Sequence, residues 1–423
     1  MNGEYKKRIV DNILEKKLKG KGAVLIEGIK WCGKTTTGGM HAKSIIYMDD
    51  PSQENLMLAD INTARLLEGE TPHMIDEWQL APKIWDAVRF EVDHRQKMGQ
   101  FILTGSSTPA KMDDVHHTGT GRFSWLLMRT MSLYESSDSN GSVSLKDLFD
   151  APEQITGQSD IDIDRLTYLI CRGGWPMAVF LDEETSLEQA YDYYDAVVKR
   201  DISRVDGISR KETYARKLLH SYARNQGSQI SDAGLLSDIK SNEEDAFSIK
   251  TLTSYLGALE KIFVIEEMPA WNPNLRSKTA IRTANTRYFS DPSIAAAALG
   301  IGPKDLLNDL ITLGFLFETL AVRDLRIYTD SLGGNVYHYR DKNDLECDAV
   351  IHLRNGKYGL IEIKLGGERL IAEGTKNLKR LAAKIDTTKM NPPSFLAVVT
   401  GVGKYAYKNQ EGVYIVPIGC LKD

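Results

Sequence analysis

The sequence lacks the features that would place it in several large protein classes. Its four cysteines are widely separated and form no C-x-x-C pair, so their spacing predicts neither a zinc site nor a disulfide framework. The longest run of small apolar residues, 294–299, is far shorter than the roughly 20 residues of a transmembrane helix. The N-terminus has no apolar signal-peptide segment. We therefore expect a cytoplasmic protein with reduced thiols and no membrane partner.

An excess of positive charge is also absent. The 423 residues contain 53 Lys and Arg against 58 Asp and Glu, which gives a formal net charge of −5. A protein that coats nucleic acid through bulk charge would be basic, so this class is excluded, whereas a local basic cleft is not. The length predicts two or three domains.

A phosphate-binding loop is present near the N-terminus. Residues 28–35 read G-I-K-W-C-G-K-T, the pattern G-x-x-x-x-G-K-T, and the apolar run 23–26 before them predicts a buried strand. The two glycines permit positive φ, and successive N–H groups at a helix start attract phosphate. We expect Lys34 to reach the β- and γ-phosphates of ATP and Thr35 to bind Mg²⁺. The predicted nucleotide-binding residues are Gly28, Ile29, Lys30, Trp31, Cys32, Gly33, Lys34, Thr35 and Thr36.

An acidic pair follows the second predicted strand after the loop. The first of these strands covers 44–49, and the second lies within 71–78, T-P-H-M-I-D-E-W, where Pro72 and His73 interrupt the apolar run. A short strand that ends in Asp-Glu is typical of a P-loop protein. Asp76 would hold Mg²⁺ through water, and Glu77 would polarise the attacking water. The alternative is an acidic turn before a helix.

Two further groups are candidates for contact with the γ-phosphate. The segment 100–107 predicts a strand whose polar tip lies beside the P-loop, at the sheet edge where α/β proteins bind ligands. A hydroxyl there can sense phosphate or position water, and we choose Thr104, with Ser106 second. Arg122 follows in G-T-G-R-F and could act as an arginine finger, in cis or from a neighbouring subunit. The alternative is an ordinary salt-bridge arginine in a turn.

The order of these motifs resembles a known family. The P-loop, 75–77, 103–107 and Gly121-Arg122 are followed by G-G-W-P at 173–176 and by Arg200-Asp201. This series is similar to the AAA+-type prokaryotic ATPases in which a P-loop domain precedes a widespread C-terminal domain of unknown function. The resemblance covers nearly the whole chain. It implies an AAA+-like ATPase core, a helical and winged-helix middle, and a C-terminal domain related to the PD-(D/E)xK nuclease fold, and it supplies no substrate.

The expected fold class is α/β, with three domains. A polar, turn-rich stretch at 136–142 predicts a boundary near residue 145. The domains are then an AAA+-like P-loop ATPase domain at 1–145, a helical and winged-helix region at 146–295, and a restriction-endonuclease-like α/β domain at 296–423.

The charged residues of the middle region do not decide whether it binds DNA, because some favour binding and others oppose it. Residues 248–256 resemble a second helix, and 262–265 would begin a wing strand. Basic residues lie on and after this wing, whereas the loop 242–245 is acidic. The alternative is a purely structural module. The basic residues are Arg276, Lys278, Arg282 and Arg287.

The C-terminal part contains a second constellation of charged residues. An apolar helix at 314–320 carries Glu318, and strands at 336–340, 346–351 and 358–364 follow, the last two joined by an Asn-Gly hairpin. Alternation places Glu362 and Lys364 on one face of the last strand. The set resembles a PD-(D/E)xK centre, in which Asp348 and Glu362 share Mg²⁺, Lys364 orients water and Glu318 completes the shell. The alternative is a charge network on an inactive descendant of that fold.

The predicted function is Mg²⁺-dependent ATP hydrolysis that drives or gates a C-terminal effector domain. The alternatives are an ATP-gated, Mg²⁺-dependent nuclease and a DNA-binding regulatory protein without significant turnover. The expected ligands are ATP or ADP and Mg²⁺, and DNA, RNA, a protein partner and an oligomer are candidate partners.

Overall fold

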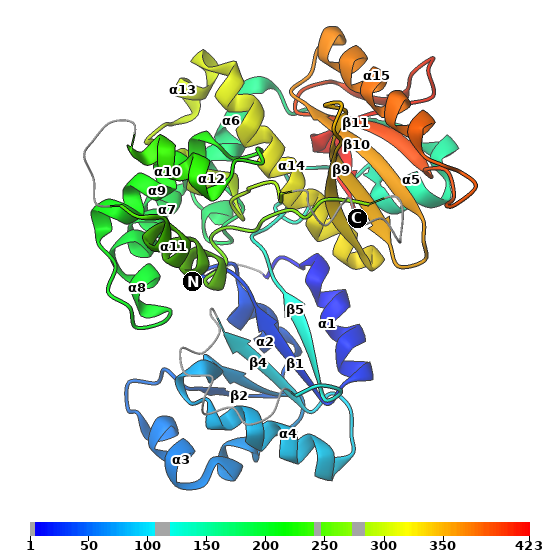
Figure 1. The fold of residues 1–423 in the computed structure, drawn as a ribbon. Helices are drawn as coiled ribbons and strands as arrows, with labels where there is room; N and C mark the ends of the chain where they lie inside the picture. The colour runs from blue at the N-terminus through cyan, green and yellow to red at the C-terminus, as the bar shows by residue number, and fades with distance from the viewer. Residues whose placement is uncertain (1–4, 106–118, 241–246, 273–283) are drawn as a thin grey trace.

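The computed structural model describes residues 5–105, 119–240, 247–272 and 284–423. Figure 1 shows an N-terminal sheet with its helices at one end of the molecule, a group of helices beside it, and a second sheet near the C-terminus. The sheets have five and seven strands, and a two-stranded pair completes the described strands. Among the described helices, none is both long and apolar enough to cross a bilayer.

The N-terminal sheet is parallel throughout, in the order β2-β3-β4-β1-β5. Every residue of β4 and nearly every residue of β1 is buried, as expected for a parallel sheet that is covered on both faces. The strands expected at 23–26, 44–49, 71–78 and 100–107 are present, whereas β5 was not anticipated. The elements are α1 (Ile9–Gly20), β1 (Ala23–Glu27), α2 (Lys34–His41), β2 (Ser44–Tyr47), α3 (Glu54–Asn62), η1 (Thr63–Leu67), β3 (His73–Asp76), η2 (Trp78–Leu80), α4 (Lys83–Arg95), β4 (Phe101–Gly105) and β5 (Phe123–Leu127).

His73 opens β3 although a polar side chain is unusual in a central strand. The residue is 5% exposed. Its Nε2 lies 2.8 Å from the carbonyl oxygen of Leu66, and its Nδ1 lies 2.7 Å from Oγ of Ser44. Because both ring nitrogens have partners, burial of the imidazole costs little, and the strand reaches Asp76 without interruption.

The middle of the chain is helical. The alanine-rich α12 (Pro292–Leu299) is almost wholly buried between its neighbours, because small side chains allow close packing. The expected wing strand at 262–265 is present only as isolated antiparallel bridges, Ile265 to Phe289 and Met268 to Thr286. The winged helix therefore remains a prediction. The other elements here are α6 (Ile163–Arg172), η5 (Ala178–Phe180), α7 (Glu183–Ala196), the π-helical turn η6 (Val197–Asp201), α8 (Ile202–Arg204), α9 (Glu212–Arg224), α10 (Asp232–Lys240), α11 (Ile249–Lys261) and α13 (Pro303–Asn308).

The basic residues of the expected wing can be compared with the structure only at Arg287. Its side chain is buried and donates to carboxylate oxygens of Glu267 and Asp232. This arginine is therefore committed to internal ion pairs rather than presented to DNA. Arg276, Lys278, Arg282 and the acidic loop 242–245 lie outside the described residues.

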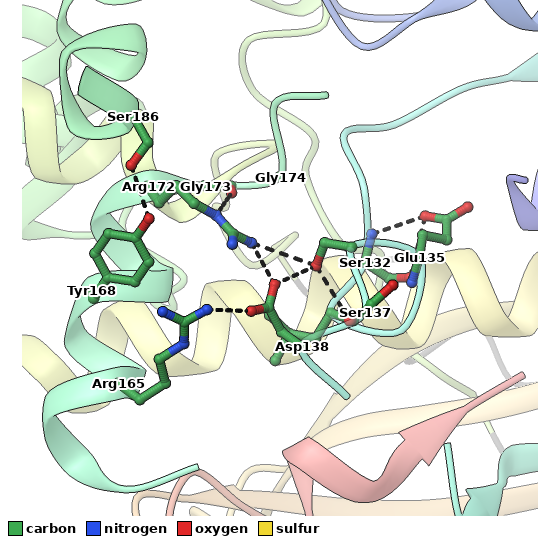
Figure 2. Close-up of polar contacts among 12 residues, drawn as sticks. Ser132, Glu135, Ser137, Asp138, Arg165, Tyr168, Arg172, Gly173, Gly174 and Ser186 are labelled. Carbon is green, nitrogen blue, oxygen red and sulfur yellow. Dashed lines mark hydrogen bonds and ion pairs between the residues drawn. The ribbon is translucent and has the colours of Figure 1, made fainter. Parts of the chain in front are cut away.

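The buried Asp138, in the segment after β5, forms ion pairs with two arginines of α6. Figure 2 shows Asp138 between the guanidinium groups of Arg165 and Arg172, each 2.7 Å from a different carboxylate oxygen. Burial alone would favour the neutral acid, but Arg172 and Arg165 hold the pKa of Asp138 below its ordinary value. A satisfied ionic contact thereby joins the segment that follows β5 to α6.

The C-terminal sheet has the order β7-β12-β13-β11-β10-β9-β8. Strands β8, β9 and β10 are antiparallel, β11 is parallel to β10, and α15 packs on β10 and β11. The helix at 314–320 and the strands at 336–340, 346–351 and 358–364 are present as expected. The elements are α14 (Leu310–Leu332), β8 (Gly334–Arg340), β9 (Glu346–Leu353), β10 (Tyr358–Lys364), α15 (Glu368–Lys384), β11 (Phe395–Thr400), β12 (Tyr405–Lys408), β13 (Tyr414–Pro417), η8 (Ile418–Cys420) and β14 (Leu421–Lys422).

An earlier segment also contributes to this end of the molecule. β7 pairs with β12, and β6 pairs with β14. The division of the chain at residues 145 and 295 remains a prediction. The elements of this segment are β6 (Val143–Ser144), α5 (Leu145–Asp150), η4 (Pro152–Gln154) and β7 (Gly157–Gln158).

Candidate functional site

The glycine-rich loop, residues 28–35, begins directly after β1, and its last two residues are the first two of α2. Gly28 has φ +144°, and a Cβ there would lie 2.0 Å from the carbonyl oxygen of Met128, so only glycine fits. Gly33 has φ +102° and caps the N-terminus of α2. The Lys34 side chain is buried, and its Nζ donates to the carbonyl oxygens of Gly28 and Ile29 at 2.8 Å each. The ammonium is thus held inside the curl of the loop.

Three oxygen-bearing side chains meet beside this loop. Thr35 donates its hydroxyl to Oδ1 of Asp76 at 2.9 Å, and the Thr104 hydroxyl donates to the same carboxylate. They come from the start of α2 and from the carboxyl ends of β3 and β4, which lie at one edge because the sheet is parallel. Hydroxyl and carboxylate oxygens are ligands that suit Mg²⁺. The structure therefore brings together three of the sequence-predicted residues.

Glu77 is the first residue beyond β3 and has φ +53°. Burial raises the pKa of its carboxyl, while the amide of Gln79, which donates to it, and the nearby Lys34 oppose that rise. A partly buried carboxyl with a raised pKa is suited to accepting a proton. Gln79 is a contact that the sequence did not indicate, and the second-choice hydroxyl of Ser106 lies outside the described residues.

The central residues of the loop contact the helical region. Nζ of Lys30 forms an ion pair with Asp201 of η6 at 2.7 Å. Trp31, at φ +65°, lies edge-on to Tyr193 of α7, with ring centroids 5.7 Å apart. The buried Cys32 accepts a hydrogen bond on its carbonyl oxygen from Arg8 at 2.9 Å. The tip of the loop is therefore anchored outside its own sheet.

Arg122 lies at the opposite edge of the sheet from the P-loop. Its carbonyl oxygen accepts a bond from the N–H of Ala23, the first residue of β1, whereas the loop follows the last residue of that strand. Five residues of strand separate the two edges by roughly 16 Å. The guanidinium instead forms an exposed ion pair with Asp93 at 2.8 Å. The expectation that Arg122 reaches the nucleotide of its own chain is therefore wrong, because the residue precedes β5 instead of following it.

The substitution Arg122→Ala should leave ATP hydrolysis unchanged within about twofold at low protein concentration, as expected for an exposed side chain. Steady-state phosphate release measures this. A loss of tenfold or more that appears only as the protein concentration rises would show that Arg122 acts on a neighbouring copy.

A second cluster of charges lies on the C-terminal sheet. Nζ of Lys364 is 2.7 Å from Oε2 of Glu362 and 3.0 Å from Oδ2 of Asp348, which also accepts the N–H of Ile363. Glu362 is 1% exposed, and its Oε1 has no hydrogen-bond partner. Burial and the neighbouring Asp348 raise the pKa of Glu362 well above its ordinary value. An orphaned, buried carboxylate oxygen needs a cation or a proton.

Glu318 joins this cluster from α14. Burial and Asp348 raise its pKa, and the buried hydroxyl of Tyr288 donates to its Oε1. The next residue, Thr319, donates to the amide oxygen of Gln226, whose Nε2 has no partner. Sequence reasoning missed Tyr288 and Gln226, which lie in the middle region. Within the described residues, no group of three or more His, Cys, Asp or Glu side chains is arranged to hold a metal ion.

Residues 20–137 match a protein family described as "AAA domain". The chain thus carries an AAA-type P-loop domain. Residues 163–305 and 313–421 match two families, each described as a domain of unknown function (DUF8612 and DUF4143).

Other proteins are similar to this chain over a larger share of its residues. The chain is 24% identical over 347 residues to the uncharacterized proteins Mb2031c of Mycobacterium bovis and Rv2008c of Mycobacterium tuberculosis, over 81% of this chain and 70% of each relative. The Walker-type ATPase PABY2304 of Pyrococcus abyssi aligns with a TM-score of 0.43 and 15% identity, over 68% of this chain and 94% of that chain.

Proposed function

We propose that the AAA-type domain binds ATP with Mg²⁺ and hydrolyses it. The observation that carries this proposal is the meeting of Thr35, Asp76 and Thr104 at the sheet edge beside the buried ammonium of Lys34. The glycine-lined curl provides N–H groups for phosphate, and the oxygen set fits a hard divalent cation.

Each residue has a distinct task in this proposal. Lys34 and the loop N–H groups bind the β- and γ-phosphates, and Thr35 and Asp76 hold Mg²⁺, which when bound supplies positive charge against the phosphate oxygens. Glu77 orients the attacking water and accepts its proton, while Thr104 fixes the orientation of Asp76.

We further propose that the nucleotide drives or gates the remainder of the chain. The ion pair of Lys30 with Asp201 and the contact of Trp31 with Tyr193 support this, because a rearranged loop cannot keep both contacts unchanged. Magnesium-dependent phosphate release from ATP by the whole chain is the direct test. Tight ATP binding without release would leave the alternative, a regulatory nucleotide-binding protein with a DNA-binding winged helix.

A second candidate function is a Mg²⁺-dependent nuclease centre at Glu318, Asp348, Glu362 and Lys364. The order of helix, three antiparallel strands, helix and parallel strand supports a relation to the PD-(D/E)xK fold. The unpartnered Oε1 of Glu362 supports metal binding. Mg²⁺ commonly takes one or two carboxylates and completes its shell with water and substrate phosphate, so Asp348 and Glu362 are a sufficient pair.

The substitution Glu362→Gln should abolish Mg²⁺-dependent cleavage of DNA or RNA, at least about a hundredfold, because it removes one of the two metal-binding carboxylates. Cleavage is measured on single- and double-stranded substrates with ATP and Mg²⁺ present. Glu411→Gln, in the same C-terminal part but exposed and paired with Lys379, is the control. Cleavage that persists in Glu362→Gln, or no cleavage of any substrate by the wild type, would reduce the cluster to a structural network.

The other expectations remain proposals. They are a cytoplasmic location, a protein partner and an oligomeric state. The four cysteines are free and buried, which supports a reducing compartment.

A further inference from the structure

The arginine that follows β5 connects the three stretches of the chain that match separate families. Arg129 lies within residues 20–137, and its side chain is 9% exposed. Its Nε and Nη2 donate to the two carboxylate oxygens of Glu266 at 2.8 and 2.6 Å, and its Nη1 donates to Asp330 of α14 at 2.6 Å. Glu266 lies within 163–305 and Asp330 within 313–421. One guanidinium therefore joins the AAA-type domain to both of the other parts.

The main chain at this arginine contacts the P-loop. The carbonyl oxygen of Met128 lies only 2.0 Å from the place that a Cβ on Gly28 would take, and it accepts a hydrogen bond from the thiol of Cys32. Arg8 donates to the carbonyl oxygens of Cys32 and Arg129 at 2.9 Å each. The first and fifth residues of the loop are therefore held against the residues that position the guanidinium.

Binding of a triphosphate must change the hydrogen bonds of the loop. The Lys34 ammonium has three N–H donors, and two of them are directed at the carbonyl oxygens of Gly28 and Ile29. Contact with both the β- and the γ-phosphate requires that at least one of these bonds is released. A ligand shifts a conformational equilibrium through contacts that differ between the two states, and these bonds differ. Because Gly28 lies against Met128, the change reaches the segment that carries Arg129.

The contact with Glu266 is rigid enough to pass on such a change. Burial would raise the pKa of Glu266, but Arg129 and Arg326 lower it to about 2, so the carboxylate is ionised at neutral pH. Two parallel hydrogen bonds fix the orientation of the guanidinium relative to the carboxylate. A displacement of Arg129 therefore moves Glu266 with it.

The partners of Arg129 lead to the charged cluster of the C-terminal sheet. The N–H of Glu266 donates to the carbonyl oxygen of Tyr288 at 2.9 Å, and the hydroxyl of Tyr288 donates to Glu318. Glu318 and Asp330 both lie on α14. The two carboxylates that hold Arg129 are thus linked to Glu318, one through Tyr288 and the other through the helix.

We propose that Arg129 transmits the nucleotide state of the P-loop to the segment around Glu266 and to α14, and through them to the cluster at Glu318. The proposal rests on the proposed function, because it requires ATP to bind in the P-loop. It names the contact through which the nucleotide acts on the C-terminal sheet. It does not require the cluster to cleave nucleic acid.

Hydrogen–deuterium exchange of the whole chain, with and without saturating ATP and Mg²⁺, tests the proposal. In the wild type, ATP should change the exchange rates of residues 264–268 and 325–332 at least about threefold, because backbone hydrogen bonds there open with a different frequency. Arg129→Lys keeps the positive charge and loses the paired geometry, so both changes should disappear.

A second variant separates the two branches. Asp330→Ala, at a side chain that is 39% exposed, should abolish the change in 325–332 and keep the change in 264–268, because the contact between Arg129 and Glu266 remains. Arg216→Lys is the control, since this arginine of α9 also has two carboxylate partners. It should keep both changes.

The outcomes separate this proposal from the proposed function. If the wild type binds ATP and neither segment responds, or if Arg129→Lys or Asp330→Ala responds like the wild type, transmission through Arg129 is wrong although the P-loop site stands. If titration calorimetry shows that the wild type does not bind ATP, the proposed function fails, and this proposal fails with it.

Discussion

Lys34→Ala is expected to weaken ATP binding at least about a hundredfold and to reduce ATP turnover to background. The Lys34 ammonium donates to two carbonyl oxygens of the loop, each 2.8 Å away. This position inside the loop is where the β- and γ-phosphates would lie. Removing the ammonium deletes charge-assisted hydrogen bonds in a buried setting, and each is worth about 1.5–3 kcal/mol. Titration calorimetry with Mg²⁺ present measures the affinity, and phosphate release measures the turnover.

The matched control is Lys43→Ala, which removes an exposed lysine shortly after the end of α2. It alters the net charge equally and should bind ATP like the wild type. Equal binding by Lys34→Ala and Lys43→Ala would remove the assignment of the P-loop as the nucleotide site.

Glu77→Gln is expected to retain ATP binding while lowering kcat by about 10²–10⁴-fold, the usual contribution of a general base. The side chain keeps its shape and loses the group that accepts a proton from water. Because burial raises the pKa of Glu77, the wild-type carboxylate is lost at a higher pH than an exposed glutamate would be. Turnover should therefore fall on the acid side above the ordinary glutamate pKa of about 4.3.

The residual turnover of Glu77→Gln should not fall on the acid side of the pH profile. This difference from the wild type distinguishes a catalytic role of Glu77 from a merely structural one. Glu68→Gln, at an exposed position after η1, is the control. A Glu77→Gln variant that turns over ATP at the wild-type rate would transfer the role of base to another group.

The geometry of the candidate nucleotide site was largely predictable because its parts follow local rules. The P-loop is one contiguous motif. Asp76 and Thr104 each lie at the carboxyl end of a strand in a parallel sheet, so strand prediction was enough to place them together. Arg122 failed the same reasoning because β5 begins after it, and the direction of a strand decides which edge its flanking residues occupy.

The contacts that could not be predicted join residues far apart in sequence. Lys30 pairs with Asp201, and Tyr288 donates to Glu318, across elements whose packing no local pattern encodes. The burial of His73 in β3 could not be explained from the sequence for a similar reason, since its two hydrogen-bond partners come from other segments. Periodicity located the strands and helices, but the pairing of side chains between modules required the tertiary structure.

The long-range strand pairs near the C-terminus can form only late in synthesis on the ribosome. Gln158 of β7 and its partner Tyr405 of β12 are 247 positions apart, and Val143 of β6 is even farther in sequence from its partner Leu421. At common translation rates the earlier strands emerge roughly 12–50 s before their partners. During that interval β6 and β7 have no native strand to pair with. Newly made chains should therefore need chaperone protection at residues 143–158, which expression at lower temperature with added chaperones would reveal as a higher yield of folded protein.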